Sequence, residues 1–351
     1  MAKRARSRKG APGIVEVAAR AGVSPATVSR YFNDPEIVRL PTRKRIERAA
    51  SELGYIRDRM AGAMHNRFSG TIGLIVPTID NAIFAEMIAA FSAQLLKHDR
   101  TMLIAAHDYD LEREVAIVRS LLERRIDGIA LVGFDHESVP LNMLSERNVP
   151  VISIWNYSPS SQIPCIGADN FEAGRIVTRH LIDLGHRNIS LIFADSAGND
   201  RARDRRSGSM AAFKECELEP PMGNLHTCSY DVGEAKKLAI SILASDRPSA
   251  IVCGNDIISH GAIYACQALG LSVPEDISIV GIGDFRGSAH MEPGLTTVRL
   301  PAKRIGALAA DALVGMNETG MLPVPPRHKV ELSFMNRGST ALVGRSDDLQ
   351  K

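Results

Sequence analysis

The order of apolar and polar residues divides the chain into a short N-terminal part and a longer remainder. Near the start, apolar residues recur at i, i+3, i+4 and i+7, which places them on one face of a short helix. From residue 71 onward the pattern changes to short, continuous apolar runs separated by amphipathic stretches. Such runs are typical of parallel strands buried on both faces, with helices between them. The first helical face consists of Ile14, Val17, Ala18 and Ala21.

A second short helix is expected immediately after the first. Gly22 ends the first helix, and Ser24 is placed to cap the second, whose first residue is Pro25, where a missing N–H costs nothing. Val28 and Phe32 face inward. Two short helices joined by a tight Gly turn predict a helix-turn-helix, whose second helix enters the major groove of DNA. An ordinary helical hairpin is the alternative.

The second helix projects small, hydroxyl and basic side chains outward, which suits contact with bases and phosphates. A third helix follows the turn at residues 34–35 and ends at Gly54. Residues 57–68 have few apolar side chains at core spacing, and Gly62 weakens a helix there by roughly 1 kcal/mol relative to Ala, so this segment is expected to be unstructured alone. The predicted DNA-binding residues of the second helix and its cap are Ser24, Pro25, Ala26, Thr27, Ser29, Arg30 and Asn33.

The remainder of the chain contains too many strand and helix units for one open sheet of ordinary width, so two doubly wound lobes are expected. The predicted strands are residues 71–77, 101–107, 128–133, 151–155, 188–194, 225–230, 250–254 and 277–283. The predicted helices with assigned bounds are residues 82–97, 111–125, 171–184, 204–217, 232–244 and 257–269.

Charge separates the same two parts. The chain of 351 residues has a formal net charge of +2, but residues 1–70 hold 15 Lys and Arg against 6 Asp and Glu, and the rest holds 27 against 34. Positive charge on one module supplies a salt-dependent attraction to phosphates. A merely solvated basic surface is the alternative.

The sequence contains no feature that points to a membrane, a metal or secretion. No apolar run approaches membrane-spanning length, and the basic N-terminus lacks the apolar core of a secretory signal, so a cytoplasmic protein is expected. The odd number of five cysteines and the absence of CxxC or Cys/His ligand spacing indicate reduced thiols and no metal site. We also expect no cofactor.

The N-terminal module resembles the LacI/GalR family of sugar-responsive repressors. The strings that carry the resemblance are Val17-Ala18, Ala21-Gly22-Val23-Ser24, Thr27-Val28-Ser29-Arg30 and Asn33. The resemblance implies that residues 57–68 become a helix on the operator and insert an apolar side chain, here Met64, between base pairs of the minor groove. Met is an acceptable wedge. Arg57, where Pro is common, and Met64, where Leu is common, depart from the family pattern, and a plain flexible linker is the alternative.

The resemblance extends over the body and implies a periplasmic-binding-protein-like fold. It rests on several strings in order, among them Asp80-Asn81 with Phe84-Ala85-Glu86, Arg125-Ile126-Asp127-Gly128, Gly185-His186-Arg187, Asn255-Asp256, Leu295-Thr296-Thr297-Val298 and Arg337-Gly338-Ser339-Thr340. The expected organisation is a basic tail (1–12), a helix-turn-helix domain (13–57), a hinge segment (58–69), an effector-binding and dimerisation domain (70–340) and a tail (341–351). Lobe one is expected at about 70–168 and 299–326, and lobe two at about 169–298 and 327–340.

Ligands of open α/β sheets bind beyond the carboxyl ends of the strands, so the residues that follow each apolar run are candidates. A sugar needs hydrogen-bonding groups for its hydroxyls together with an aromatic platform. By resemblance, Arg205 matches the family's effector-contacting arginine, because Arg203, Arg205 and Gly208 reproduce its RxRxxG string; a surface charge is the alternative. The predicted effector-binding residues are Phe84, Trp155, Asn156, Arg205, Asn255, Asp256 and Asp284.

Two departures bear on the effector. The family usually carries an aromatic residue at the position of Cys228 and an Asp at the position of Gly283. Gly283 followed by Asp284, together with Trp155, resembles the gluconate-operon repressors within the family. A sugar acid is therefore the leading expectation over a neutral sugar. Two alternatives stay open: Trp155 is a core residue, or an arginine in the cleft forms a structural ion pair and does not bind a carboxylate of the ligand.

Catalytic signatures are absent from the sequence: it has no Walker A string, no HExxH and no GxSxG, and the glycines from 281 to 287 have the wrong spacing for a dinucleotide site. The expected function is that of an operator-binding repressor and homodimer, controlled by a small sugar or sugar acid. The 11 residues after Thr340 leave no room for a tetramer-forming heptad tail. The alternative is a cytoplasmic or exported sugar receptor of the same body fold.

Overall fold

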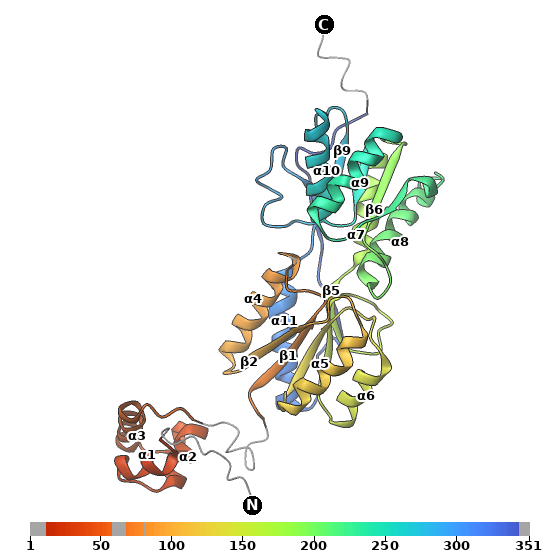
Figure 1. Cartoon of the computed structure of the whole chain (residues 1–351). Helices are drawn as coiled ribbons and strands as arrows, with labels where there is room; N and C mark the ends of the chain where they lie inside the picture. Colours follow the sequence, from red (N-terminus) through yellow and green to blue (C-terminus); the bar gives the residue numbers. More distant parts are fainter. Residues whose placement is uncertain (1–11, 58–67, 81, 344–351) are drawn as a thin grey trace, which may run out of the picture. The chain divides into compact units, whose positions relative to one another are not determined.

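The computed structural model describes residues 12–57, 68–80 and 82–343 of the chain (Figure 1). By internal contacts the chain divides into two compact units, Met1–Ser69 and Gly70–Lys351. The predicted wedge residue Met64 lies outside the described residues. Among the described helices, none combines the length and apolar character that crossing a bilayer requires.

The N-terminal unit has the predicted helix-turn-helix geometry. Gly22 adopts φ +64° and ends the first helix, and its left-handed backbone is the reason that glycine suits this position. The Ser24 side chain accepts a hydrogen bond from the backbone N–H of Thr27 at 3.1 Å, so the predicted cap is confirmed. Val17, Val28 and Ile46 pack in one small core. The helices are α1 (Ile14–Ala21), α2 (Pro25–Asn33), the 3-10 turn η1 (Pro35–Ile37) and α3 (Leu40–Leu53).

The body consists of two sheets that have the same winding pattern. The strand order is β11-β5-β4-β3-β1-β2 in the first sheet and β12-β10-β9-β8-β6-β7 in the second. The described pairings are parallel except for β10 with β12. The strands of the first sheet are β1 (Thr71–Val76), β2 (Thr101–Ala106), β3 (Gly128–Val132), β4 (Val151–Asn156), β5 (Cys165–Ala168) and β11 (Arg327–Lys329). Those of the second are β6 (Ile189–Phe193), β7 (Leu225–Thr227), β8 (Ala250–Cys253), β9 (Ser278–Gly283), β10 (Thr296–Arg299) and β12 (Ser333–Met335).

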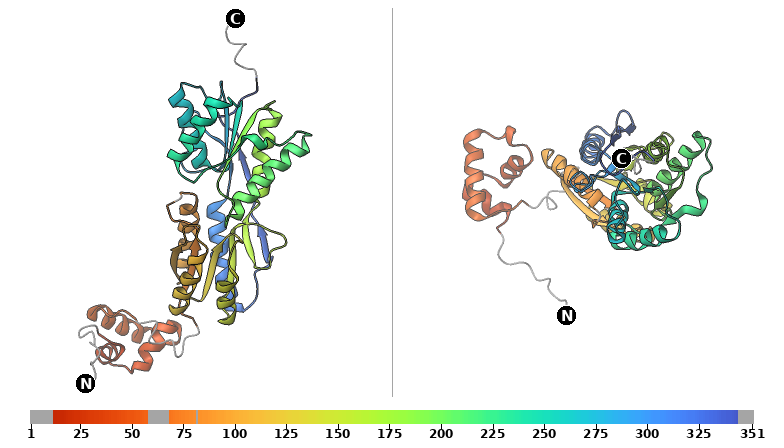
Figure 2. Two further views of the ribbon diagram at one scale, coloured as in Figure 1. Left: turned by 45° about the vertical axis from the view of Figure 1, so that its right-hand side comes forward. Right: turned by 90° about the horizontal axis from the view of Figure 1, so that it is seen from above.

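Helices cover both faces of each sheet, as Figure 2 shows. Alternate strand residues face opposite layers: Leu74 packs in the core that contains α4 and α11, whereas Ile75 packs with α5 and α6. In the second lobe, Leu191 faces α7 and Ile192 faces α9 and α10. The predicted pair of doubly wound lobes is therefore confirmed. The helices are α4 (Ala82–Lys97), α5 (Glu112–Glu123), α6 (Ser138–Glu146), α7 (Asn170–Asp183), α8 (Asp200–Glu215), the 3-10 turn η2 (Met222–Asn224), α9 (Val232–Ser245), α10 (Asp256–Leu269) and α11 (Ala302–Thr319).

The lobe boundaries differ from the expected ones near the C-terminus. Arg299 pairs with Gly283 inside the second sheet, and β11 pairs with β5 inside the first. Residues 327–329 therefore belong to lobe one, and the last crossing to lobe two falls after Lys329 rather than before Arg327. Polar β11, with the sequence Arg-His-Lys, has no apolar run by which the sequence could reveal it.

Helix α8 begins four residues earlier than predicted. Asn199 caps it by accepting a hydrogen bond from the N–H of Ala202 at 3.3 Å, which brings Asp200 and Arg201 into the first turn. Glycines let α8 cross α7 closely: a Cβ at Gly208 would lie 1.8 Å from the carbonyl oxygen of Phe171, and one at Gly174 would lie 2.0 Å from that of Arg205. This crossing fixes where the early residues of α8 lie in lobe two.

Candidate DNA-binding helix and effector site

The N-terminal part of α2 presents an exposed row of small and polar side chains. Ser24, Pro25 and Ala26 are exposed, as is Arg30 one turn further on. Thr27 and Ser29 are half-buried, and the hydroxyl of Thr27 lies 2.9 Å from that of Ser24. This arrangement suits a recognition helix, because such a helix contacts base edges with the residues at its N-terminus.

Arg57, one of the departures from the family pattern, contacts the end of α2. Its guanidinium donates to the carbonyl oxygen of Phe32 and to the side-chain oxygen of Asn33. Asn33 is exposed, as predicted, but its amide oxygen is already used within the unit. Arg57 thereby connects the segment after α3 to the recognition helix.

The predicted aromatic residues of the body lie in the core of lobe one. Trp155 is 1% exposed and Phe84 is 2% exposed, and their rings meet edge to face with centroids 5.2 Å apart. Trp155 adopts φ +79° at the carboxyl end of β4. Its ring is therefore part of the packed wall of lobe one, as the alternative of a core residue predicted, and a contact of Trp155 with the effector stays a prediction.

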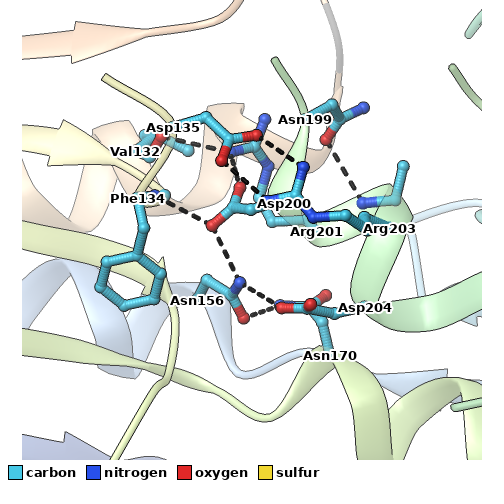
Figure 3. A network of polar contacts seen from close by, with 12 residues as sticks. Val132, Phe134, Asp135, Asn156, Asn170, Asn199, Asp200, Arg201, Arg203 and Asp204 are labelled. Carbon is cyan, nitrogen blue, oxygen red and sulfur yellow. Dashed lines mark hydrogen bonds and ion pairs between the residues drawn. The ribbon is translucent and has the colours of Figure 1, made fainter. Parts of the chain in front are cut away.

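Asn156 lies at the centre of a polar junction between the two lobes (Figure 3). Its Nδ2 donates to Asp200 at 2.9 Å and to Asp204 at 2.7 Å, both on α8 of lobe two. Its Oδ1 accepts from Asn170 Nδ2 at 2.9 Å and from the N–H of Tyr157 at 3.0 Å. Asn156 therefore has all four of its hydrogen-bonding positions filled by the chain.

Arg205 is buried in lobe two at 2% exposure, which excludes the alternative of a surface charge. Its Nε donates to Oδ1 of Asn170 and one Nη donates to the carbonyl oxygen of Gly254, both at 2.8 Å. Burial lowers the pKa of Arg205. The two acceptors of these hydrogen bonds, a side-chain amide and a backbone carbonyl, are neutral. The charge of the Asp256 carboxylate acts on Arg205 and opposes the lowering of its pKa.

Asn255 and Asp256, both predicted to bind the effector, have hydrogen-bond partners within the chain. Asn255 caps α10 by accepting from the N–H of Ile258 at 3.0 Å. Asp256 accepts from the hydroxyls of Ser288 at 2.6 Å and Thr297 at 2.7 Å, and from the N–H of Phe285 at 3.0 Å. Burial raises the pKa of Asp256, and these donors oppose the rise. The two side chains hold the start of α10 and the loop that follows β9.

Asp284 also has partners within the chain. Its carboxylate accepts from Arg337 at 2.6 Å and from Nε of Arg299 at 2.6 Å, and the carboxylate is 5% exposed. This double ion pair ties the loop after β9 to β10 and to the segment after β12. The structure thus gives Asp284 a structural role beside the predicted one.

A cavity of about 870 Å³ lies among α4, the loop after β9 and the start of α11. Trp155 and Asp284 line it, whereas the other predicted effector residues do not. Gly283 has φ +142°, and a Cβ there would lie 2.3 Å from the ring of Phe285, so the ring takes the space that the family's usual Asp side chain needs. The charged and titratable lining residues are Glu86, Asp284, Arg286, His290, Arg299, Lys303 and Arg304.

Two tyrosines near Arg205 escaped the reasoning from sequence. Tyr109 follows β2 in lobe one and Tyr230 follows β7 in lobe two, and their ring centroids are 5.9 Å apart. Burial raises the pKa of Tyr109 well above its ordinary value, with Tyr230 adding to the rise. Cys228, at the position where the family usually has an aromatic residue, is buried, and the aromatic side chain of this loop is Tyr230 two residues later. Tyr230 was missed because the predicted strand, residues 225–230, contained it, whereas β7 ends at Thr227 and Tyr230 lies in the loop that follows.

Comparisons with known proteins agree with this geometry. Residues 13–58 match the family of bacterial regulatory proteins of the lacI type, and residues 69–321 match the periplasmic binding proteins and sugar binding domain of the LacI family. The transcriptional regulator GntR of Escherichia coli K12 is 31% identical over 316 residues, which cover 88% of this chain and 92% of that one. The transcriptional repressor PurR of Klebsiella pneumoniae is 30% identical over 304 residues, covering 86% and 89%.

Solved structures show the same architecture. The transcription regulator GntR of Chromobacterium violaceum has a TM-score of 0.73 at 28% identity, covering 77% of this chain and 99% of that one. The lac repressor dimer bound to operator and the anti-inducer ONPF has a TM-score of 0.83 at 24% identity, covering 95% and 100%, and it supports the fold.

A helix-turn-helix unit attached to a two-lobed ligand-binding body defines a DNA-binding transcription regulator that responds to a small molecule. The chain belongs to the LacI family of bacterial regulatory proteins. It is a repressor of the kind that a small molecule controls, and its relatives are regulators rather than enzymes.

Proposed function

We propose that this protein is a cytoplasmic homodimeric repressor whose operator affinity is set by a small sugar acid bound between the two lobes. The observation that carries the choice of an acid is Arg205: its guanidinium is buried and donates hydrogen bonds to neutral acceptors, and a ligand anion offsets the cost of burying its charge. A neutral sugar gives no such compensation.

Arg205 does not line the cavity beside α4 and α11, but the lining of that cavity also favours an anion. Four Lys or Arg residues line it against Glu86 and Asp284, and Asp284 is already paired with Arg299 and Arg337. The Phe285 ring fills the space that a side chain at position 283 would need, so no carboxylate from that position accepts hydrogen bonds from a neutral polyol. The wall therefore favours an anion with an apolar face over a neutral hexose.

On DNA, we propose that Pro25, Ala26 and Arg30 face base edges, while hydroxyl side chains and Asn33 meet phosphates. The exposed position of Arg30 supports a base contact, because an arginine guanidinium can donate two hydrogen bonds to one guanine, at O6 and N7. Met64 is proposed as the minor-groove wedge. The hydroxyl residues proposed for phosphate contact are Ser24, Thr27 and Ser29.

A dimer is proposed because a helix-turn-helix protein reads two half-sites whose spacing reflects its own two-fold symmetry. The lac repressor, which has this fold, is a dimer in its solved complex with operator, and this supports the proposal by analogy. Sedimentation of the full chain at micromolar concentration should give twice the chain mass of 38.0 kDa. A monomer or a tetramer there contradicts this part of the proposal.

The test of the effector begins with a thermal-shift screen of neutral sugars, aldonates and phosphorylated sugars. Each hit is then titrated into the complex of the protein with an operator selected from a random DNA library. A ligand that changes operator affinity must bind the two lobe arrangements unequally, and such coupling is typically about 1 to 3 kcal/mol. Hits confined to neutral sugars contradict the acid, and a body that binds ligand without any DNA selection favours the receptor alternative.

A further inference from the structure

The chain returns to the end of the recognition helix after α3. The helix α3 ends at Gly54, which has φ +61°. The N–H of Tyr55 donates to the carbonyl oxygen of Ala50 at 2.9 Å, which completes the turn. The ring of Tyr55 packs against the ring of Phe32, and their centroids are 5.6 Å apart. Residues 54–57 therefore run beside the C-terminal end of α2.

Arg57 joins this returning segment to α2 at two points. One Nη of its guanidinium donates to the carbonyl oxygen of Phe32, and the other donates to Oδ1 of Asn33. Phe32 and Asn33 are the last two residues of α2, and the final carbonyl groups of a helix lack donors within it and favour a nearby cation. Because both donors belong to one rigid plane, they fix the position and the direction of the chain at residue 57.

This contact closes a long loop of chain inside the DNA-binding unit. Arg57 lies 25 residues after Phe32, and the turn η1 and the whole of α3 lie between them. Residues 58–69 then lead to the body, which begins at Gly70. The segment that connects the unit to the body therefore starts from a point that is fixed relative to the helix proposed to read DNA.

We propose that Arg57 is a positioning residue that makes the protein selective for the spacing between the two half-sites of its operator. The inference rests on the proposed function, a dimer that reads DNA, and names a residue that sets this spacing. A dimer binds two half-sites best at the separation at which its two recognition helices are held. A connecting segment that starts in one fixed direction narrows the range of separations that the dimer accepts.

Operators of altered spacing test the inference in the full-length protein. An operator selected by the wild-type protein is compared with two versions in which one base pair is inserted or removed between the half-sites. We call the ratio of these affinities the spacing selectivity. Arg57→Gln lacks the cation and the paired donors, so it should lower the spacing selectivity about threefold or more, as the loss of hydrogen bonds predicts. Its affinity for DNA with a single half-site should stay close to that of the wild type.

Two further variants separate the contact with α2 from a general effect of charge. Arg48→Gln is the matched control, because it removes the same charge from an arginine that pairs with Glu52 inside α3, and it should leave the spacing selectivity unchanged. Asn33→Ala removes one acceptor of the Arg57 guanidinium and should also lower the spacing selectivity. Combined with Arg57→Gln it should have less than the sum of the two effects, because both substitutions break the same contact.

Three outcomes overturn the inference: an unchanged spacing selectivity in Arg57→Gln, an equal loss of affinity on every DNA, which a direct phosphate contact would give, and full additivity with Asn33→Ala. If Arg57→Gln does not fold, as thermal melts would show, Arg57→Lys decides in its place, because it keeps the charge, lacks the fork and should also lower the spacing selectivity. A wild-type protein that selects no pair of half-sites contradicts the proposed function, and the inference falls with it before any variant is made.

Discussion

Nε of Arg205 donates to Oδ1 of Asn170 across 2.8 Å, and both side chains are buried where α7 and α8 cross. The amide holds the guanidinium plane in one orientation, so its remaining donors are aimed before any ligand arrives. Preorganised donors of this kind give more affinity than flexible ones because little freedom is lost on binding.

Arg205→Lys tests the importance of that orientation. Lysine keeps the positive charge but lacks the planar guanidinium with its fixed pair of donors. A hydrogen bond to a charged group contributes about 1.5 to 3 kcal/mol, so the effector-induced change in operator affinity should fall tenfold or more. Effector titration of the operator complex measures it. Arg206→Lys on the same helix is the control and should respond as the wild type does. A normal response from Arg205→Lys would remove Arg205 from the effector site.

Arg30→Ala tests base reading. Loss of a bidentate base contact should cost about 1 to 3 kcal/mol on the selected operator and little on random DNA, because phosphate contacts are independent of sequence. Fluorescence anisotropy with both DNAs at one fixed salt concentration measures the two affinities. Equal losses on both would show that Arg30 contacts phosphate rather than bases.

Gly208→Ala tests the close crossing of α7 and α8. The added Cβ would lie 1.8 Å from the carbonyl oxygen of Phe171, so the helices must separate, and the free energy of unfolding should fall by about 2 kcal/mol or more. Gly315 in α11 has no atom within 4 Å of the position of its Cβ, so Gly315→Ala should instead stabilise by about 0.5 to 1 kcal/mol. Urea denaturation of both variants compares them, and equal effects would contradict the packing argument.

Asp204→Asn tests a pH dependence at the lobe junction. Burial raises the pKa of Asp204 above its ordinary 3.8, and the nearby Asp200 carboxylate adds to the rise. Between 3.8 and the raised value the folded protein holds the proton more tightly than the unfolded chain, so stability falls as pH rises through this window. Asn keeps an oxygen for the bond from Asn156 and carries no charge.

The variant should therefore have a higher Tm than the wild type at about pH 7, and the difference should shrink as the pH is lowered toward about 4. Thermal melts across this range measure it. Asp183→Asn, which removes an exposed ion pair to Arg179, is the control and should change Tm little. A Tm difference that is constant with pH would show that the effect does not come from the charge.

Local signals made the helix-turn-helix predictable. The turn at Gly22 and the cap at Ser24 involve residues within a few positions of each other, so their chemistry is visible in a short stretch of sequence. The alternation of apolar strands with helices likewise predicted both lobes.

The junction could not be predicted in this way. Asp135 and Arg203 are 68 residues apart, and their meeting depends on how two separate lobes approach each other. The side chains of Asn255 and Asp256 were expected to face a ligand because they follow the carboxyl end of a strand. That position in the sheet does not determine which neighbouring groups donate hydrogen bonds to their side-chain oxygens. For the same reason the position of Trp155 in the sheet could not decide whether its ring lies in the core or faces a ligand.

The position of β11 has a consequence for how the protein is made. Lobe one begins at Gly70, yet its sheet is completed only by Arg327–Lys329, and α11 that covers it begins at Ala302. During synthesis, about 250 residues must therefore leave the ribosome after the first strand before that lobe can close, which at about 5 to 20 residues per second takes on the order of ten seconds or more. Through that interval the edge of β5 is unpaired, and a ribosome that stalls within α11 leaves a chain in which neither lobe is whole.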